Sequence, residues 1–184
     1  MKENKSLLMK SAMFYGLLLG ISWAIKYVFF ILGVTIPSMQ IVYWILTPLT
    51  LLFAYIFTNT YKFLIGGKIS FFHAWQFGVL LYFFAALIIS LGHYIFYQYI
   101  ASPDFISSSV NQAISLMKDM DLNMQIKEAI DQITVPTPIQ MTIQGIFNNV
   151  FYGTILSIPV AALLCRNNST GLIINQNNQG RNEL

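Results

Sequence analysis

Five polar residues interrupt four long apolar stretches of the chain at similar expected depth, namely Lys26, Thr47, His93, Gln144 and Asn148. Placing an ionisable group inside a membrane costs free energy. The first hypothesis for such a residue is therefore a function as a proton relay, an anion site or a substrate contact. The alternative for Lys26 is snorkelling, in which the alkyl stem follows the helix and the ammonium reaches the interface. The five residues are therefore a candidate polar cluster, with a structural role of Lys26 as the alternative.

The last apolar stretch carries the strongest polar pattern in the chain. One helical face holds residues at a spacing of four: Gln140, Gln144, Asn148 and Tyr152. The adjacent face holds Gly145, Asn149 and Gly153. Because amides that face lipid keep unsatisfied donors and acceptors, we expect this helix to turn its amide side toward the bundle.

Other chemistry-bearing residues are too dispersed to form a site. His73 and His93 lie about 30 Å apart along one helix, and Cys165 belongs to the end of the last span opposite His93, where it resembles a small apolar residue. None of the spans contains a carboxylate, and the sequence has no P-loop, dinucleotide fingerprint or nucleophile elbow. We expect a non-enzymatic protein with no catalytic residue, cofactor or metal ligand.

The elements that position these residues are four membrane-spanning helices. Charge is absent from residues 11–25, 27–61, 69–103 and 132–165, and about 20 apolar residues suffice to cross the hydrocarbon layer. The predicted spans cover about 12–34, 39–58, 71–100 and 139–164. The sequence predicts an all-α fold, a four-helix transmembrane bundle, within a single integral membrane domain, residues 1–166.

An amphipathic helical segment is predicted outside the membrane at about 107–133, between the third and fourth spans. Two apolar stripes lie on opposite sides of an ideal helix there, so a break near 121–123 would let both face one surface. The segment is a lid on its own bundle, a helix on the outer leaflet or a docking site for a partner. The polar residues 167–184 are predicted to form a disordered cytoplasmic tail.

Small side chains recur every fourth residue in the first span, at Ala12, Gly16, Gly20 and Ala24. This spacing lets a second helix approach closely. We favour a neighbour within the same bundle over a partner subunit or a second copy of the chain.

The charge of the chain follows membrane topology. The protein has 184 residues, 9% of them charged, with a net charge of +3. Most basic residues fall in segments that share one side if the chain crosses four times, so the positive-inside rule places both termini in the cytoplasm. Because the basic residues are scattered, the sequence predicts the lipid bilayer as a partner and no nucleic acid.

Several short motifs are similar to those of a known family: Gly66-Gly67, Ile69-Ser70, Gly78, the run 97–100, the run 103–106 and the run 157–162. On these motifs the chain resembles the four-span inner-membrane proteins of Bacteroidota called domain of unknown function 4199. The resemblance implies a multi-pass protein of the bacterial inner membrane without an assigned activity. It also implies a membrane-associated glycosyltransferase as a partner, because members are often encoded beside one.

Two hypotheses of different classes follow. The first is a non-enzymatic accessory or partner subunit in envelope glycan or lipid metabolism. The alternative is a small oligomeric transporter or channel that uses the candidate polar cluster as a path. The transporter hypothesis requires Lys26 for flux, and the subunit hypothesis requires a stable protein partner.

Overall fold

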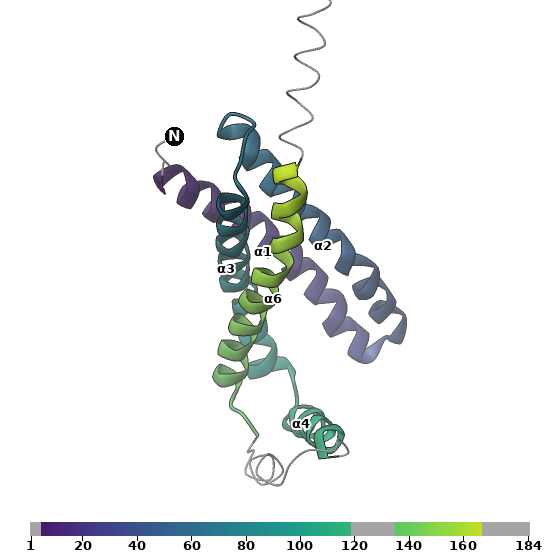
Figure 1. Cartoon of the computed structure of the whole chain (residues 1–184). Coiled ribbons are helices and arrows are strands. Elements are labelled where there is room, and N and C mark those ends of the chain that lie inside the picture. Colours follow the sequence, from purple (N-terminus) through teal and green to yellow (C-terminus); the bar gives the residue numbers. More distant parts are fainter. Residues whose placement is uncertain (1–4, 119–134, 167–184) are drawn as a thin grey trace, which may run out of the picture. The chain divides into compact units, whose positions relative to one another are not determined.

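The computed structural model describes residues 5–118 and 135–166. Within these residues four helices are long and apolar enough to cross a membrane, and no strand occurs, which confirms the all-α fold with four spanning helices. They are α1 (Lys5–Thr35), α2 (Pro37–Leu64), α3 (Phe71–Ile95), which continues into the π-helical turn η1 (Phe96–Ile100), and α6 (Pro138–Arg166) (Figure 1).

Helices α1 and α2 form an antiparallel hairpin with one residue between them, Ile36 (Figure 1). Pro37 begins α2 because its fixed φ suits the first helical position and its missing N–H would have no partner there. Close to this turn, a Cβ added at Gly33 would lie 2.7 Å from Oε1 of Gln40. Because Gly33 has no side chain, Gln40 of α2 can lie directly against α1 next to this tight turn.

Helix α2 continues past the predicted end of the second span, at about residue 58, and includes Tyr61 and Lys62. It stops before two glycines with positive φ, Gly66 at 99° and Gly67 at 78°. The Gly67 N–H donates to the carbonyl of Lys62 at 2.9 Å, so the turn satisfies one of the last free carbonyls of the helix.

The chain divides into two compact units, and the first contains residues 1–89 and 146–184. Within it, α1 and α3 run parallel and touch through small residues. A Cβ added at Gly16 would lie 2.6 Å from Cβ of Phe84, and one added at Gly20 would lie 2.7 Å from Cβ of Ile88. The two backbones therefore approach as closely as glycine permits.

Aromatic and polar contacts join α2 to α3 at the ends connected by the glycine turn. The rings of Tyr61 and Phe77 stack with centroids 4.2 Å apart. The Tyr61 hydroxyl and His73 Nε2 form a hydrogen bond of 2.6 Å. Because both Tyr61 and Phe77 are almost completely buried, this stack anchors the core of the first unit.

The second unit contains residues 90–145. It includes the end of α3, η1, the helix α4 (Pro103–Lys118) and the start of α6. The Ala101 N–H donates to the Phe96 carbonyl at 2.8 Å and closes the π-helical turn, and the Phe96 side chain is buried. The predicted break near 121–123 and the predicted tail 167–184 lie outside the described residues.

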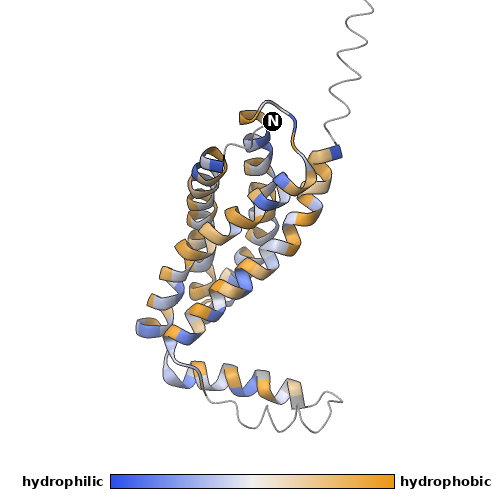
Figure 2. Ribbon diagram, turned by 60° about the vertical axis from the view of Figure 1, so that its left-hand side comes forward, coloured by the Kyte–Doolittle hydropathy of each residue, from blue (hydrophilic) through white to orange (hydrophobic). Residues whose placement is uncertain are grey.

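Large apolar side chains are exposed along all four spanning helices. Figure 2 shows hydrophobic residues along the ribbons of these helices. Such a surface would be a liability in water, since soluble proteins rarely expose extended apolar patches. In hydrocarbon it is the expected outer surface of a bundle. The described residues are thus consistent with a membrane protein in their surface as well as in their helix lengths.

Candidate functional site

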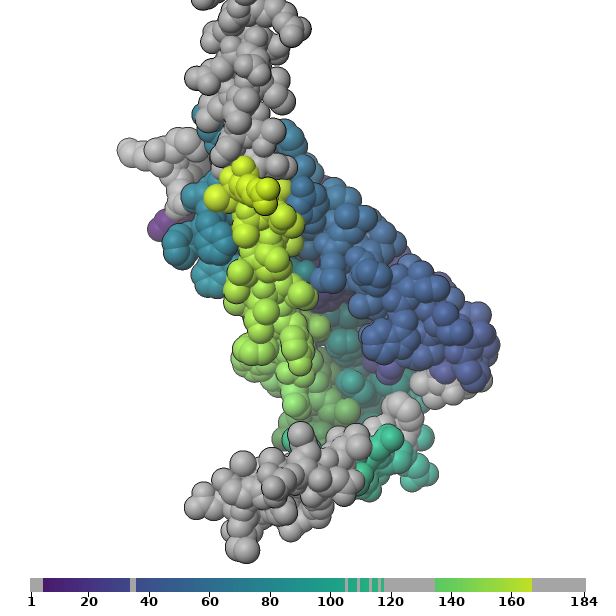
Figure 3. Space-filling model, turned by 45° about the vertical axis from the view of Figure 1, so that its right-hand side comes forward, coloured from purple at the N-terminus to yellow at the C-terminus, as the bar shows by residue number. Residues whose placement is uncertain are grey.

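The amide side of α6 faces outward. Gln144 and Asn148 are both exposed, and neither side chain hydrogen-bonds to another described residue. Tyr152, one turn further, is 62% exposed. The prediction that α6 turns its amide side toward the bundle is therefore wrong. We call these three residues, Gln144, Asn148 and Tyr152, the amide stripe. Figure 3 shows that α6 lies uncovered along the face seen there.

The orientation of α6 follows from the small residues on its other side. Gly153 packs directly against the ring of Tyr82, where even a Cβ would overlap with ring atoms. Ser157 packs against Gly78, where an added Cβ would lie 2.5 Å from the Ser157 Oγ. Since close packing of α6 on α3 requires this small face, the amide stripe is left on the outside.

Two hydrogen bonds secure the same face. The Ser157 hydroxyl donates to the Gly153 carbonyl at 2.6 Å and is buried, so it exposes no free polar group to the core. The Trp75 Nε1–H donates to the Thr154 carbonyl at 3.1 Å and ties α3 to α6. The Ser157 hydroxyl and the Trp75 indole N–H are therefore satisfied within the bundle, unlike the amides of the amide stripe.

The amide stripe lies at membrane depth. Helix α6 has 29 residues, or about 43 Å at 1.5 Å per residue, and Tyr152 is its middle residue. By the same rise Asn148 is about 6 Å from the middle and Gln144 about 12 Å. Both amides fall inside a hydrocarbon core about 30 Å thick if α6 crosses it centrally.

Gln140 has a different role from the rest of its predicted face. Its Oε1 accepts hydrogen bonds from the Thr137 backbone N–H at 2.8 Å and from the Thr137 hydroxyl at 3.0 Å. The Gln140 N–H in turn lies 3.4 Å from the Thr137 hydroxyl. This is a capping box at the start of α6, and its signal in the sequence, Thr-x-x-Gln before an apolar run, escaped our sequence analysis.

Two members of the predicted polar cluster, Lys26 and Thr47, meet at Tyr43 on the hairpin of α1 and α2. The Lys26 Nζ lies 5.0 Å from the centroid of the Tyr43 ring, within the range of a cation–π contact. The Thr47 hydroxyl donates to the Tyr43 carbonyl at 3.0 Å, inside its own helix. Among the described residues neither side chain hydrogen-bonds to Asn148, which belongs to the same unit.

The other two members belong to the second unit. His93 is half-buried and packs against Gly145, because an added Cβ there would lie 3.3 Å from His93 Nδ1. Its ring also lies 6.4 Å from that of Tyr97. Gln144 is exposed. The five residues are thus divided between the two units, three in the first and two in the second.

The predicted small-residue seam is largely occupied by α3. Ala12 is fully buried, and Gly16 and Gly20 are buried against Phe84 and Ile88. Ala24 is only partly buried. The glycines of the seam therefore serve packing within the chain, and the exposed surface that remains for another molecule is elsewhere.

Lys62 is a further polar residue, and it lies inside α2 although the second span was predicted to end at about residue 58. Its side chain is only 5% exposed, and its Nζ donates a hydrogen bond of 2.9 Å to the carbonyl oxygen of Leu164. The residue stands at the end of a span, where a lysine normally reaches the interface, so the sequence held no signal for burial. The contact joins the last turns of α2 and α6.

No group of three or more His, Cys, Asp or Glu side chains within residues 5–118 and 135–166 is arranged to hold a metal ion. Cys165 is a free thiol at the end of α6 and is partly buried. Tyr61 and His73 are two side chains with acid–base chemistry that form a hydrogen bond of 2.6 Å. Because the Tyr61 ring also stacks on Phe77, this pair has a structural role in the core.

Comparison with known proteins identifies a family and no function. A family model described as Protein of unknown function (DUF4199) matches residues 14–166, most of the chain and all four spanning helices in large part. No curated protein and no solved structure matches the chain.

Proposed function

The chain belongs to the family described as Protein of unknown function (DUF4199), and we propose that it is a non-enzymatic subunit that binds another membrane protein through α6. The observation that carries this proposal is the exposure of Gln144 and Asn148 without a hydrogen-bond partner among the described residues. The docking surface is the amide stripe.

The physical argument is the cost of bare amides in hydrocarbon. Each unsatisfied polar group there costs several kcal/mol, because no water is available to replace the lost hydrogen bonds. Two side-chain amides within about 12 Å of the middle of α6 therefore favour any neighbour that offers donors and acceptors. A second spanning helix with polar side chains satisfies this requirement, and hydrogen bonds of this type join membrane helices.

The surface around the stripe suits a helix partner. Phe147 and Phe151 flank it and are 71% and 63% exposed. Aromatic rings beside a few buried polar contacts are typical of the centre of protein interfaces. The amides would fix the register of the partner, while the rings and Tyr152 would supply the buried apolar area.

The resemblance to the Bacteroidota proteins suggests the kind of partner. We propose a membrane-associated glycosyltransferase of the inner membrane, with this chain as its accessory subunit in envelope glycan or lipid metabolism and with both termini in the cytoplasm. Self-association through the same stripe is the competing arrangement. Both arrangements supply hydrogen-bond partners for the amides. They differ in whether a different protein or a second copy of this chain is co-purified.

The experiment is co-purification from native membranes after replacement of both amides. Gln144→Leu together with Asn148→Leu retains the size of the side chains and removes their hydrogen bonds. We expect the tagged variant to remain folded and to lose its partner chain, because an apolar stripe is stable in lipid alone.

The matched control replaces the same residue types outside the spans, Asn111→Leu with Gln112→Leu, both exposed on α4. The control should retain the partner at the level of the unchanged protein. Recovery of the same partner with the Gln144→Leu and Asn148→Leu variant would overturn the docking surface. Recovery of this chain alone from unchanged membranes would overturn the accessory role.

A transporter or channel built from several copies is the second candidate, because amide stripes from adjacent copies would line a shared polar surface. This candidate requires a flux that depends on Lys26, the charged member of the predicted cluster. Folded Lys26→Met protein in liposomes should lose that flux if the candidate is correct. Its contact with Tyr43 favours a structural role instead.

A further inference from the structure

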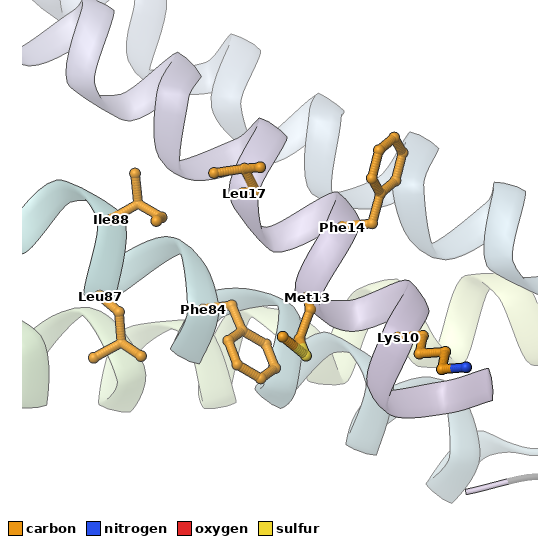
Figure 4. Close-up of a pocket in the computed structure, with 7 residues that line it drawn as sticks. All are labelled: Lys10, Met13, Phe14, Leu17, Phe84, Leu87 and Ile88. Carbon is orange, nitrogen blue, oxygen red and sulfur yellow. The ribbon is translucent and has the colours of Figure 1, made fainter. Parts of the chain in front are cut away.

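A second feature of the surface is an apolar groove between α1 and α3, with a volume of about 450 Å³. Met13, Phe14 and Leu17 line it from α1, and Phe84, Leu87 and Ile88 line it from α3 (Figure 4). Lys10 completes the lining at one end. All seven residues belong to the first unit.

The groove results from the close approach of the two helices. Gly16 meets Phe84, and Gly20 meets Ile88, so at these two positions no side chain of α1 separates the helices. The larger side chains of Met13 and Leu17, beside these positions, form the α1 wall of the groove and are 51% and 42% exposed. The walls are therefore accessible from the surrounding hydrocarbon.

Lys10 gives the groove a polar end. It lies about 8 Å along α1 from Lys5, where the candidate span begins. A span of 29 residues is about 43 Å long and exceeds a 30 Å hydrocarbon layer by roughly 7 Å at each end. The Lys10 ammonium thus stands near the boundary between hydrocarbon and lipid headgroups.

The Lys10 side chain is exposed, and it forms no salt bridge with another residue of the described part of the chain. Its stem joins the apolar wall, and its ammonium is available to an anion in the headgroup layer. The groove therefore offers one positive charge at the interface and an apolar channel that leads away from it into the membrane.

We propose that this groove is a binding site for one anionic phospholipid, whose phosphate pairs with Lys10 and whose acyl chain lies between α1 and α3. The charge decides the class of lipid, because a lipid with no net negative charge would gain less from Lys10. The apolar walls decide between a lipid and a soluble anion, because a free headgroup would leave the groove unused. The site is separate from the amide stripe.

The experiment measures lipid retention by the full chain with native mass spectrometry after transfer from mixed liposomes into detergent. The probes are phosphatidylglycerol and phosphatidylcholine with identical chains. We expect one phosphatidylglycerol per chain to be retained in preference to phosphatidylcholine. Lys10→Gln should weaken that retention about five-fold, the contribution of one lysine beside an anionic surface.

Two matched controls test the two halves of the site. Lys5→Gln changes an exposed lysine on the same helix outside the groove and should retain the lipid normally. Leu17→Ser should weaken retention, whereas Leu18→Ser should not, because Leu18 is similarly exposed at 38% and does not line the groove. Both serine variants place the same polar group in lipid.

Three results would overturn the proposal. The first is equal retention of the two lipids by the unchanged protein. The second is a Lys10→Gln variant that keeps its preference for phosphatidylglycerol. The third is competition by soluble glycerophosphoglycerol at the concentration at which the lipid binds, which would assign the affinity to the headgroup alone.

Discussion

The Lys62 ammonium donates a hydrogen bond of 2.9 Å to the carbonyl oxygen of Leu164, two residues that lie 102 positions apart in the chain. The carbonyl belongs to the last turn of α6, where helix carbonyls have no partner within the helix and carry partial negative charge. A buried lysine therefore satisfies a helix end, and this one bond ties the ends of α2 and α6 together.

Lys62→Met should lower the free energy of unfolding by about 1 to 3 kcal/mol, because it leaves a buried carbonyl without its donor. The measurement is reversible unfolding of the purified protein in detergent. Lys68→Met is the control, since Lys68 is exposed in the connection that follows α2. Equal stability of the two variants would show that the bond to Leu164 contributes nothing.

The hydrogen bond between Tyr61 and His73 should appear as a coupling energy. Tyr61→Phe keeps the stack on Phe77 and removes the hydroxyl, and His73→Ala removes the other partner. We expect each single variant to be less stable and the double-mutant cycle to give a coupling of about 1 kcal/mol. Strictly additive effects would mean that the two residues do not interact in the membrane.

Gly16→Leu should destabilise the contact of α1 with α3. The Cβ of the new leucine would lie 2.6 Å from the Cβ of Phe84, and neither helix backbone can shift without disturbing the core. Overpacking of this kind costs about 1 to 3 kcal/mol. Ala162→Leu introduces the same side chain on an exposed face of α6 and should be tolerated. Similar losses in both variants would argue against close packing at Gly16.

Lys26→Met should preserve the fold and the protein partner. The contact of Lys26 with the Tyr43 ring is worth roughly 0.5 to 2 kcal/mol, and we expect a loss of stability in that range. Co-purification of the variant from membranes checks the second part of the prediction. A folded Lys26→Met protein that no longer recovers the partner would place Lys26 in the docking surface.

The sequence was sufficient to predict the four spanning helices, because hydrocarbon excludes charge and the charge-free stretches leave little choice. The third span shows this well: residues 71–100 were predicted, and α3 with η1 covers Phe71–Ile100. The turn that follows α2 lies at Gly66 and Gly67, because only glycine adopts a positive φ without strain.

The orientation of α6 was not predictable from periodicity. The sequence places Gln144 and Asn148 on one face and Gly153 on the next, but it does not say which face packs more closely. The complementarity between Gly153 and the Tyr82 ring decides this, and it depends on two segments far apart in the chain. The rule that amides turn inward assumes that the single chain is the whole assembly.

The most direct test of the docking surface places a photoreactive amino acid at position 148 in native membranes. Phe72, which is 74% exposed on α3, is the control position. We predict that irradiation joins position 148 to a second protein chain and position 72 to lipid. Lipid adducts alone at position 148 would show that the amide stripe faces the bilayer and would contradict the proposed function.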